Sequence, residues 1–247
     1  GHLALRQNTT ADNNTAVGMS ALLSNTTGTR NVAVGCGALN LTQTTNDNTA
    51  LGFDALTTNT GSTNTAVGAC ALKGNQTAND NTAVGMRSLL TNTTGAANTG
   101  LGFSALKLNT TGNSNVAVGL SALAANTTAG CNTAVGHSAM LANTTGANNA
   151  AVGQASLDSN TTGNSNVAMG RNSLASNTTA GNNTGIGAFA LEQNSTGTSN
   201  TAVGQLSLNR NTTASDNTAV GRQALEANTT GCKNSSTGAL SMIANTE

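Results

Sequence analysis

Fourteen copies of the motif Asn-x-x-x-Gly follow one another through the 247 residues, and successive copies start 17 residues apart except for one step of 16. The short step runs from Asn48 to Asn64. A fixed period across a whole chain is typical of a solenoid, in which each repeat forms one coil that stacks on its neighbours. We therefore interpret residues 1–247 as a single repeat array without an internal domain boundary.

Large and small residues alternate in a fixed way when the repeated Asn is counted as position 1. Position 4 carries Val, Leu, Ile or Met in thirteen of the fourteen copies, and position 9 carries Leu or Met in every copy. Positions 3 and 8 are almost always Ala. We predict that positions 4 and 9 form the core, with the members Val17, Leu22, Val34, Leu39, Val84, Leu89, Val118, Leu123, Val135 and Met140.

Positions 2 to 4 have the composition of a β-strand, and positions 7 to 10 can form a second extended segment. A helix is disfavoured there, because the Gly at position 5 and the following Asn-Thr-Thr-Gly loop leave too few residues between them. The Gly predicts a corner with positive φ in every coil. The turn glycines include Gly18, Gly35, Gly52, Gly85, Gly119 and Gly136. The predicted fold is an all-β parallel β-solenoid, or β-roll, of about 14 coils.

Two columns of Asn, at positions 1 and 12, recur along the chain. Stacked coils place identical side chains above one another, and an amide can both donate and accept a hydrogen bond. We therefore predict two amide ladders, which need no catalytic explanation.

The composition limits how much surface one chain can bury. There is no Pro, Trp or Tyr, and only 7% of the residues are charged. Because each coil supplies only two large aliphatic side chains, we expect several chains to associate along the solenoid axis. The small Ala columns are the expected contact between chains.

Charge and hydropathy exclude two classes of partner. Basic and acidic residues balance at nine each, so the chain lacks the basic surface that attracts nucleic acid. No apolar run is long enough to span a membrane, and no basic amphipathic helix is expected. Both ends of the sequence fall inside a repeat, which indicates a segment of a longer protein.

The string Asn-Thr-Ala-Val-Gly-x-x-Ala-Leu-x-x-Asn-Thr-Thr-Gly, found at residues 14–28 and 132–146, resembles the head repeats of YadA-like trimeric autotransporter adhesins. It is also similar to the longer repeats of phage tail-fibre proteins that end in a self-cleaving chaperone. The resemblance covers nearly the whole chain and implies a parallel homotrimer of left-handed β-rolls, located on a cell surface, outside the cell or on a virion tail. The period here is longer than in the YadA-like head.

Candidate reactive residues are few and scattered. Cys36, Cys70, Cys131 and Cys232 occupy four different repeat positions and show no metal-ligand spacing. His2 and His137 both fall at position 6, eight coils apart, and no carboxylate lies at a matching position beside them. We therefore predict no catalytic residue, no cofactor site and no metal site, and we expect the chain not to be an enzyme.

Positions 12 to 14 read Asn-x-Thr in most coils, which is the acceptor motif for N-glycosylation. In a chain that passes through a glycosylating secretory route, each Asn is a candidate surface acceptor; otherwise these residues serve the turn and the ladder. The candidate acceptors are Asn25, Asn92, Asn126, Asn143 and Asn160.

The hypothesis that fits these observations is a non-enzymatic structural or adhesive fibre segment. It forms a stiff rod of associated copies and presents a surface to a receptor or polysaccharide. One alternative is an ice- or polysaccharide-binding β-solenoid, because columns of Thr make regular arrays of hydroxyl groups. Another is a monomer that assembles end to end into an extracellular filament.

Overall fold

The computed structural model describes residues 1–245, which form an all-β parallel β-solenoid of about 13 turns of about 17 residues. This part of the chain contains no helix. The predicted fold class is therefore confirmed. The strands are β1 (Thr15–Val17), β2 (Val32–Val34), β3 (Thr49–Leu51), β4 (Thr65–Val67), β5 (Thr82–Val84), β6 (Thr99–Leu101), β7 (Val116–Val118), β8 (Thr133–Val135), β9 (Ala150–Val152), β10 (Val167–Met169), β11 (Thr184–Ile186), β12 (Thr201–Val203), β13 (Thr218–Val220) and β14 (Ser235–Thr237).

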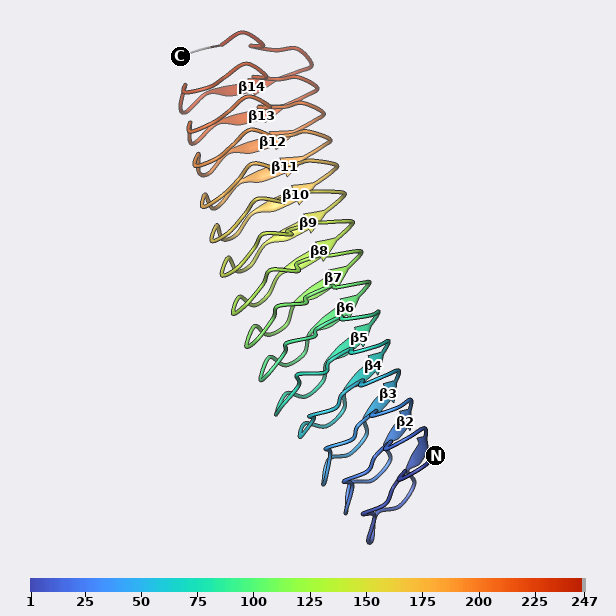
Figure 1. The fold of residues 1–247 in the computed structure, drawn as a ribbon. Helices are drawn as coiled ribbons and strands as arrows, with labels where there is room; N and C mark the ends of the chain where they lie inside the picture. The colour runs from blue at the N-terminus through green and yellow to red at the C-terminus, as the bar shows by residue number, and fades with distance from the viewer. Residues whose placement is uncertain (246–247) are drawn as a thin grey trace. The chain divides into compact units, whose positions relative to one another are not determined.

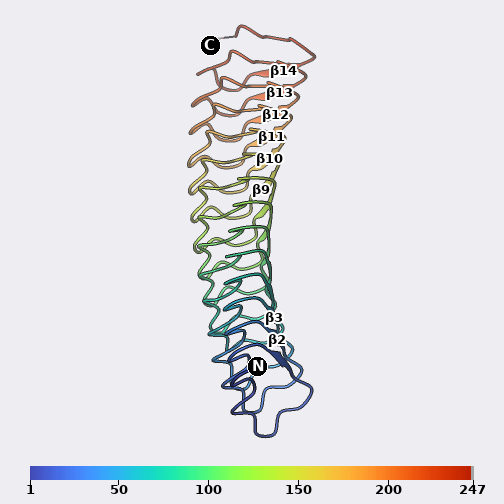
Figure 2. The same cartoon turned by 45° about the vertical axis from the view of Figure 1, so that its right-hand side comes forward.

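The coils divide into two compact units, residues 1–128 and the residues from 129 onward. In the first unit β1 to β7 pair in sequence order, and in the second unit β8 to β14 do the same (Figure 1). Every pair is parallel and joins equivalent repeat positions. Figure 2 shows β9 to β14 one above another in the second unit. The same coil builds both units.

Each coil contains one strand, at positions 2 to 4, and not the two that we predicted. Positions 7 and 9 both have positive φ, as in Ser20 (56°) and Leu22 (50°), so this segment cannot be extended. Its backbone still bonds to the neighbouring coils, for example from Leu22 N to Ala38 O at 3.0 Å. The backbone at positions 7 to 10 therefore alternates in conformation instead of forming a second strand, and it still makes hydrogen bonds between coils.

The Gly at position 5 turns the chain at the end of each strand, as predicted. Gly85 has φ of 128°, a region that side chains rarely adopt, and a Cβ built on it lies 2.5 Å from Gly102 O. The coils approach each other too closely here for any side chain. The same positive φ occurs at each predicted turn Gly, namely Gly18, Gly35, Gly52, Gly85, Gly119 and Gly136.

The interior of the coil holds Leu or Met from position 9 and Ala from positions 3 and 8. The position-9 side chains Leu22, Leu39, Leu89, Leu123 and Met140 are completely buried. The Ala residues at position 3 from Ala33 to Ala219 are equally buried, because the middle residue of the three-residue strand points inward. The expectation that Ala columns join separate chains is therefore wrong, since these methyl groups pack inside their own coil.

The side chains at position 4 do not line the interior as predicted. Alternation along the strand directs position 3 inward, so position 4 points to the outside. Val17 is 55% exposed, and the predicted core residues Val34, Val84, Val118 and Val135 are half-buried. The coil is narrow at the strand, and Ala rather than Val fits opposite the position-9 Leu.

The two predicted amide ladders are confirmed. At position 12, Asn92 Nδ2 donates to Asn75 Oδ1 at 2.8 Å. At position 1, the backbone N–H of Asn98 donates to Asn81 Oδ1 at 2.9 Å, and Asn98 Nδ2 donates to Gly112 O at 2.8 Å. These buried amides connect each coil to the next and close the loop within the coil.

The 16-residue coil absorbs its missing residue in the loop that follows Asn59. Asn59 Nδ2 donates to Gly61 O at 2.6 Å, and the next strand, β4, keeps its register with β3.

The preceding coil has Thr42 at position 12 in place of Asn. Because Thr42 donates to Asn59 O, Asn25 Oδ1 is buried without a hydrogen-bond partner.

Candidate functional site

The residues considered for chemistry do not converge on a reactive centre. His2 and His137 are both exposed. Among residues 1–245 no group of three or more His, Cys, Asp or Glu side chains is placed to hold a metal ion. The free thiols of Cys36 and Cys70 are partly exposed, and those of Cys131 and Cys232 are exposed. No helix in the described part of the chain could cross a membrane.

The candidate glycan acceptors are not on the surface. Asn25, Asn92, Asn126, Asn143 and Asn160 are all 0% exposed. Their amide nitrogens donate hydrogen bonds inside the coil, for example from Asn160 Nδ2 to Asn143 Oδ1 at 2.8 Å. A glycan on any of these amides is incompatible with the folded coil, so the expectation of surface acceptors is wrong.

The side chains at positions 2 and 4 of the strands form what we call the outer strand face. Its position-4 column is aliphatic. Some members are exposed, with Leu51 at 46%, Leu101 at 41% and Met169 at 43%, and others such as Val84 are half-buried. The neighbouring position 6, just after the turn Gly, adds exposed Met19, Phe53, Met86, Phe103 and Leu120 in the first unit. An exposed row of large apolar side chains is typical of an interaction surface.

Sequence reasoning missed this face because it assigned the position-4 aliphatic column to the core. One signal could have identified it. A three-residue strand can direct only its middle side chain inward. Position 3 is a small residue in every coil, so it fits a narrow interior that the position-9 Leu already fills. The column that alternates with position 3 must then face outward.

Two columns of Thr differ in how their hydroxyl groups are used. At position 13 the hydroxyl is engaged by the next coil, as in Thr93 Oγ1 to Thr110 O at 2.9 Å. At position 2 the hydroxyls of Thr49, Thr65 and Thr82 make no hydrogen bond to other described residues. These side chains are half-buried, so their hydroxyls remain available on the outer strand face.

Among residues 1–245, charged side chains occur only at positions 6, 7, 10, 11, 16 and 17. Lys73 Nζ contacts Asp54 Oδ2 at 2.9 Å, and this ion pair raises the pKa of Lys73. Arg30 and Asp47 form an exposed pair at 2.6 Å, and the hydrogen bond from Arg30 lowers the pKa of Asp47. Such surface pairs contribute little to stability.

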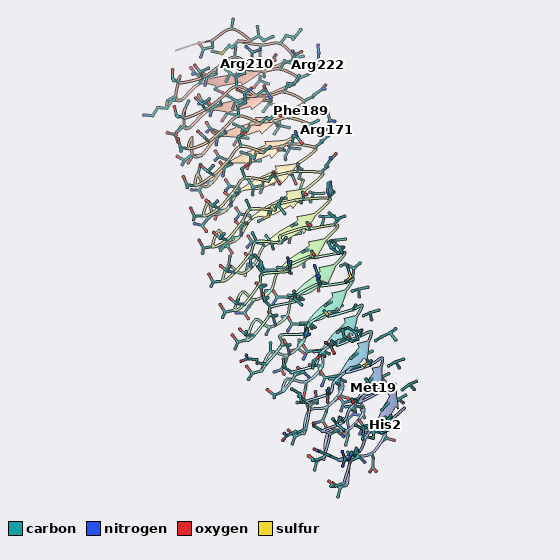
Figure 3. All side chains as sticks on the ribbon, viewed as in Figure 1. His2, Met19, Arg171, Phe189, Arg210 and Arg222 are labelled. Carbon is teal, nitrogen blue, oxygen red and sulfur yellow. The ribbon has the colours of Figure 1, made fainter. Side chains whose placement is uncertain are left out.

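Two further contacts involve charged side chains in the second unit. Figure 3 shows Arg171 beside Phe189, and the Arg171 guanidinium lies 4.5 Å from the centre of the Phe189 ring. This cation–π contact joins neighbouring coils at positions 6 and 7. Asp158 has a buried Oδ1 without a hydrogen-bond partner, and burial raises the pKa of its carboxyl while His137 acts in the opposite direction.

Comparison of the chain with protein-family models, curated proteins and solved structures found no match. The features that remain for a function are the rigid coil and the outer strand face.

Proposed function

We propose that this chain is a non-enzymatic structural and adhesive segment of a fibre, displayed outside a cell, on a cell surface or on a virion tail. Copies of the chain associate side by side as a parallel homotrimer. The variable positions 6, 7, 10, 11, 16 and 17 present the surface that meets a receptor or polysaccharide. The resemblance of the repeat to YadA-like heads and phage tail fibres supports this assignment.

The observation that carries the proposal is the exposed aliphatic column on a rigid, repeating frame. Position 4 offers a large apolar side chain in nearly every coil, at the spacing of neighbouring strands, about 4.8 Å. A surface that matches this row must repeat at the same distance. A second copy of the chain carries the same row at the same spacing. Association of the copies in parallel and in register therefore buries the row along its length.

Mechanical stiffness follows from the bonds between coils. Within each unit the coils are joined by parallel strand pairing and, except at Thr42, by the two Asn ladders. Buried polar networks of this kind hold one arrangement when every member is satisfied. A segment built in this way transmits force and resists proteases, as a spacer in a fibre requires.

The experiment is to measure the mass of the purified chain by light scattering over a range of concentrations. One chain has a mass of 24.2 kDa, and the proposal expects three times this value. Leu101→Lys, on the outer strand face, should shift the mass to that of a single chain, because it places charge in the apolar contact.

Leu108→Lys is the matched control, since Leu108 is exposed to a similar extent (44% against 41% for Leu101) but lies at position 11. It should leave the mass unchanged. A wild-type mass of one chain at every concentration contradicts the trimer. Micrometre-long fibres in electron micrographs would instead favour end-to-end assembly.

A further inference from the structure

Position 6, the first residue after the turn Gly, has a different character in the two units. In the first unit it carries neither Gln nor Arg. In the second unit the order Gln-Arg-Ala occurs twice, so the position repeats every three coils. We call these residues the position-6 row. They are Gln154, Arg171, Ala188, Gln205, Arg222 and Ala239.

The polar side chains of the row are exposed, and its charge is not neutralised by the chain itself. Arg171 and Arg222 form no ion pair within residues 1–245, and no acidic residue occupies position 6 in any coil. Glu192 and Glu226 are instead bonded to neutral amides, for example from Asn209 Nδ2 to Glu192 Oε2 at 3.0 Å. Both guanidinium groups therefore remain free to bind an anion from outside.

The backbone holds the row at a fixed spacing. Arg171 O accepts a hydrogen bond from Phe189 N, and Arg222 O accepts one from Leu240 N, both at 2.9 Å. The Phe189 ring also stacks on the Arg171 guanidinium, which leaves the N–H groups in the guanidinium plane free. The two arginines lie along one edge of the second unit (Figure 3). Because they are three coils apart, they are separated by roughly 14 Å along the axis.

The chemistry of the row suits a linear anionic ligand with hydroxyl groups. A guanidinium binds a carboxylate or a phosphate through two parallel N–H groups. The Gln before each Arg can both donate and accept, as a hydroxyl group requires of its partner. A small anion would contact only one Arg, whereas a chain that runs along the axis can contact both. A pyranose unit advances an extended polysaccharide by about the same distance as one coil.

Nucleic acid fits the row less well. A nucleic-acid strand carries a phosphate about every 3.4 Å, so one Arg in three coils leaves most of the phosphates unmatched. The chain also has no net charge that would attract a dense polyanion.

We infer that the position-6 row binds an anionic polysaccharide, bearing carboxylate or phosphate groups, that lies along the solenoid axis. The inference rests on the proposed function, in which position 6 meets the receptor, and it specifies the charge and the direction of that receptor. It is compatible with association of the copies through position 4. Three copies in register place three Arg171 side chains at one height, and like charges keep this row out of the contact between copies.

The experiment is isothermal titration calorimetry of the full chain with three probes: polygalacturonate, which carries carboxylates, a phosphate-bearing mannan, and neutral dextran. The wild type should bind an acidic polysaccharide but not dextran. The double variant Arg171→Gln, Arg222→Gln should weaken this binding by at least about tenfold, because two charge-assisted contacts are lost. Gln already occupies position 6 in neighbouring coils, so the variant should fold, and circular dichroism verifies this.

The matched control is Arg87→Gln, Arg210→Gln. It removes the same charge from two exposed arginines at positions 7 and 11, and it should bind as the wild type does. Weaker binding by the row variant alone supports the inference, and the probe that binds distinguishes a carboxylate ligand from a phosphate ligand. Three results overturn it: no binding of either acidic polysaccharide, equal loss in both double variants, or equally tight binding of DNA or polyglutamate.

The mass of each sample is measured by light scattering in parallel. A single-chain mass together with binding that depends on Arg171 and Arg222 contradicts the trimer but supports the inference. A trimeric mass without binding does the opposite. Failure of the proposed assembly and failure of the proposed ligand are therefore recorded separately.

Discussion

Asn92 accepts, at its side-chain Oδ1, a hydrogen bond of 2.8 Å from Nδ2 of Asn109, the equivalent residue of the next coil. The next member, Asn126, donates in turn to Asn109 Oδ1 at 2.8 Å. All three side chains are completely buried. Each amide is therefore both a donor and an acceptor in a chain of bonds, and each depends on its neighbours to be satisfied.

Replacement of Asn109 by Ala should destabilise the fold by at least about 2 kcal/mol, because Asn92 loses its donor and Asn126 loses an acceptor in a buried setting. The measurement is the midpoint of urea unfolding, supported by hydrogen exchange of the adjacent coils. A repeat array need not unfold in one step, so the local exchange rates locate the effect. Thr111→Ala, in the same loop but exposed, is the control and should have little effect. Equal midpoints for the two variants contradict the ladder's role.

Thr42 is the only described residue at position 12 that is not Asn, and Asn25 Oδ1 lacks a donor as a result. Thr42→Asn should complete the ladder and raise the free energy of unfolding by about 1–2 kcal/mol, the value of satisfying a buried acceptor. Thr42→Val removes the hydrogen bond to Asn59 O without supplying the donor, so it should lower stability. A lower unfolding midpoint for Thr42→Asn than for the wild type contradicts the assignment.

Gly85→Ala should prevent close stacking of the coils on either side of it. The added Cβ meets the backbone of Gly102, which cannot move without breaking strand pairing, and φ at Gly85 is unfavourable for Ala. We expect a loss of more than about 2 kcal/mol from strain and overpacking together. Urea unfolding followed by circular dichroism measures it.

Gly37→Ala is the control for the Gly85 variant. Gly37 also has positive φ (71°), but Ala155 occupies the equivalent position 7 of another coil with φ of 51°. The nearest obstacle to a Cβ at Gly37 is the flexible Asp54 side chain. A mild effect is therefore expected. Similar losses in the two variants would show that positive φ alone, rather than contact between coils, makes position 5 sensitive.

Asp158 should make stability depend on pH. Burial raises the pKa of its carboxyl from the ordinary value, so the folded chain binds this proton more tightly than the unfolded chain. The contribution of Asp158 to stability should be fully present below the unfolded pKa and should be lost as the pH rises through the folded pKa. Asp158→Asn removes the charge and should flatten this part of the profile. Urea midpoints between pH 3 and pH 7, compared for the two proteins, measure the difference; parallel profiles contradict the prediction.

Much of the fold could be predicted from the sequence because it depends on local chemistry that repeats. The 17-residue period determines the coil, the Gly at position 5 determines the corner, and the position-9 Leu column determines the interior. The Asn columns predicted the ladders, since stacking identical amides satisfies each of them. These features need no knowledge of how distant parts of the chain meet.

Only the tertiary structure decided which side of the strand faces inward. In a three-residue strand such as Thr82–Val84, either the middle residue or the two end residues can face the core. Hydrophobicity alone favours the larger Val84 as the core residue. The opposing Leu89 already fills the narrow coil, so Ala83 points inward and Val84 lies outside. The same packing holds position 9 at positive φ, buries the Asn-x-Thr acceptors and creates the outer strand face on which the proposed function depends.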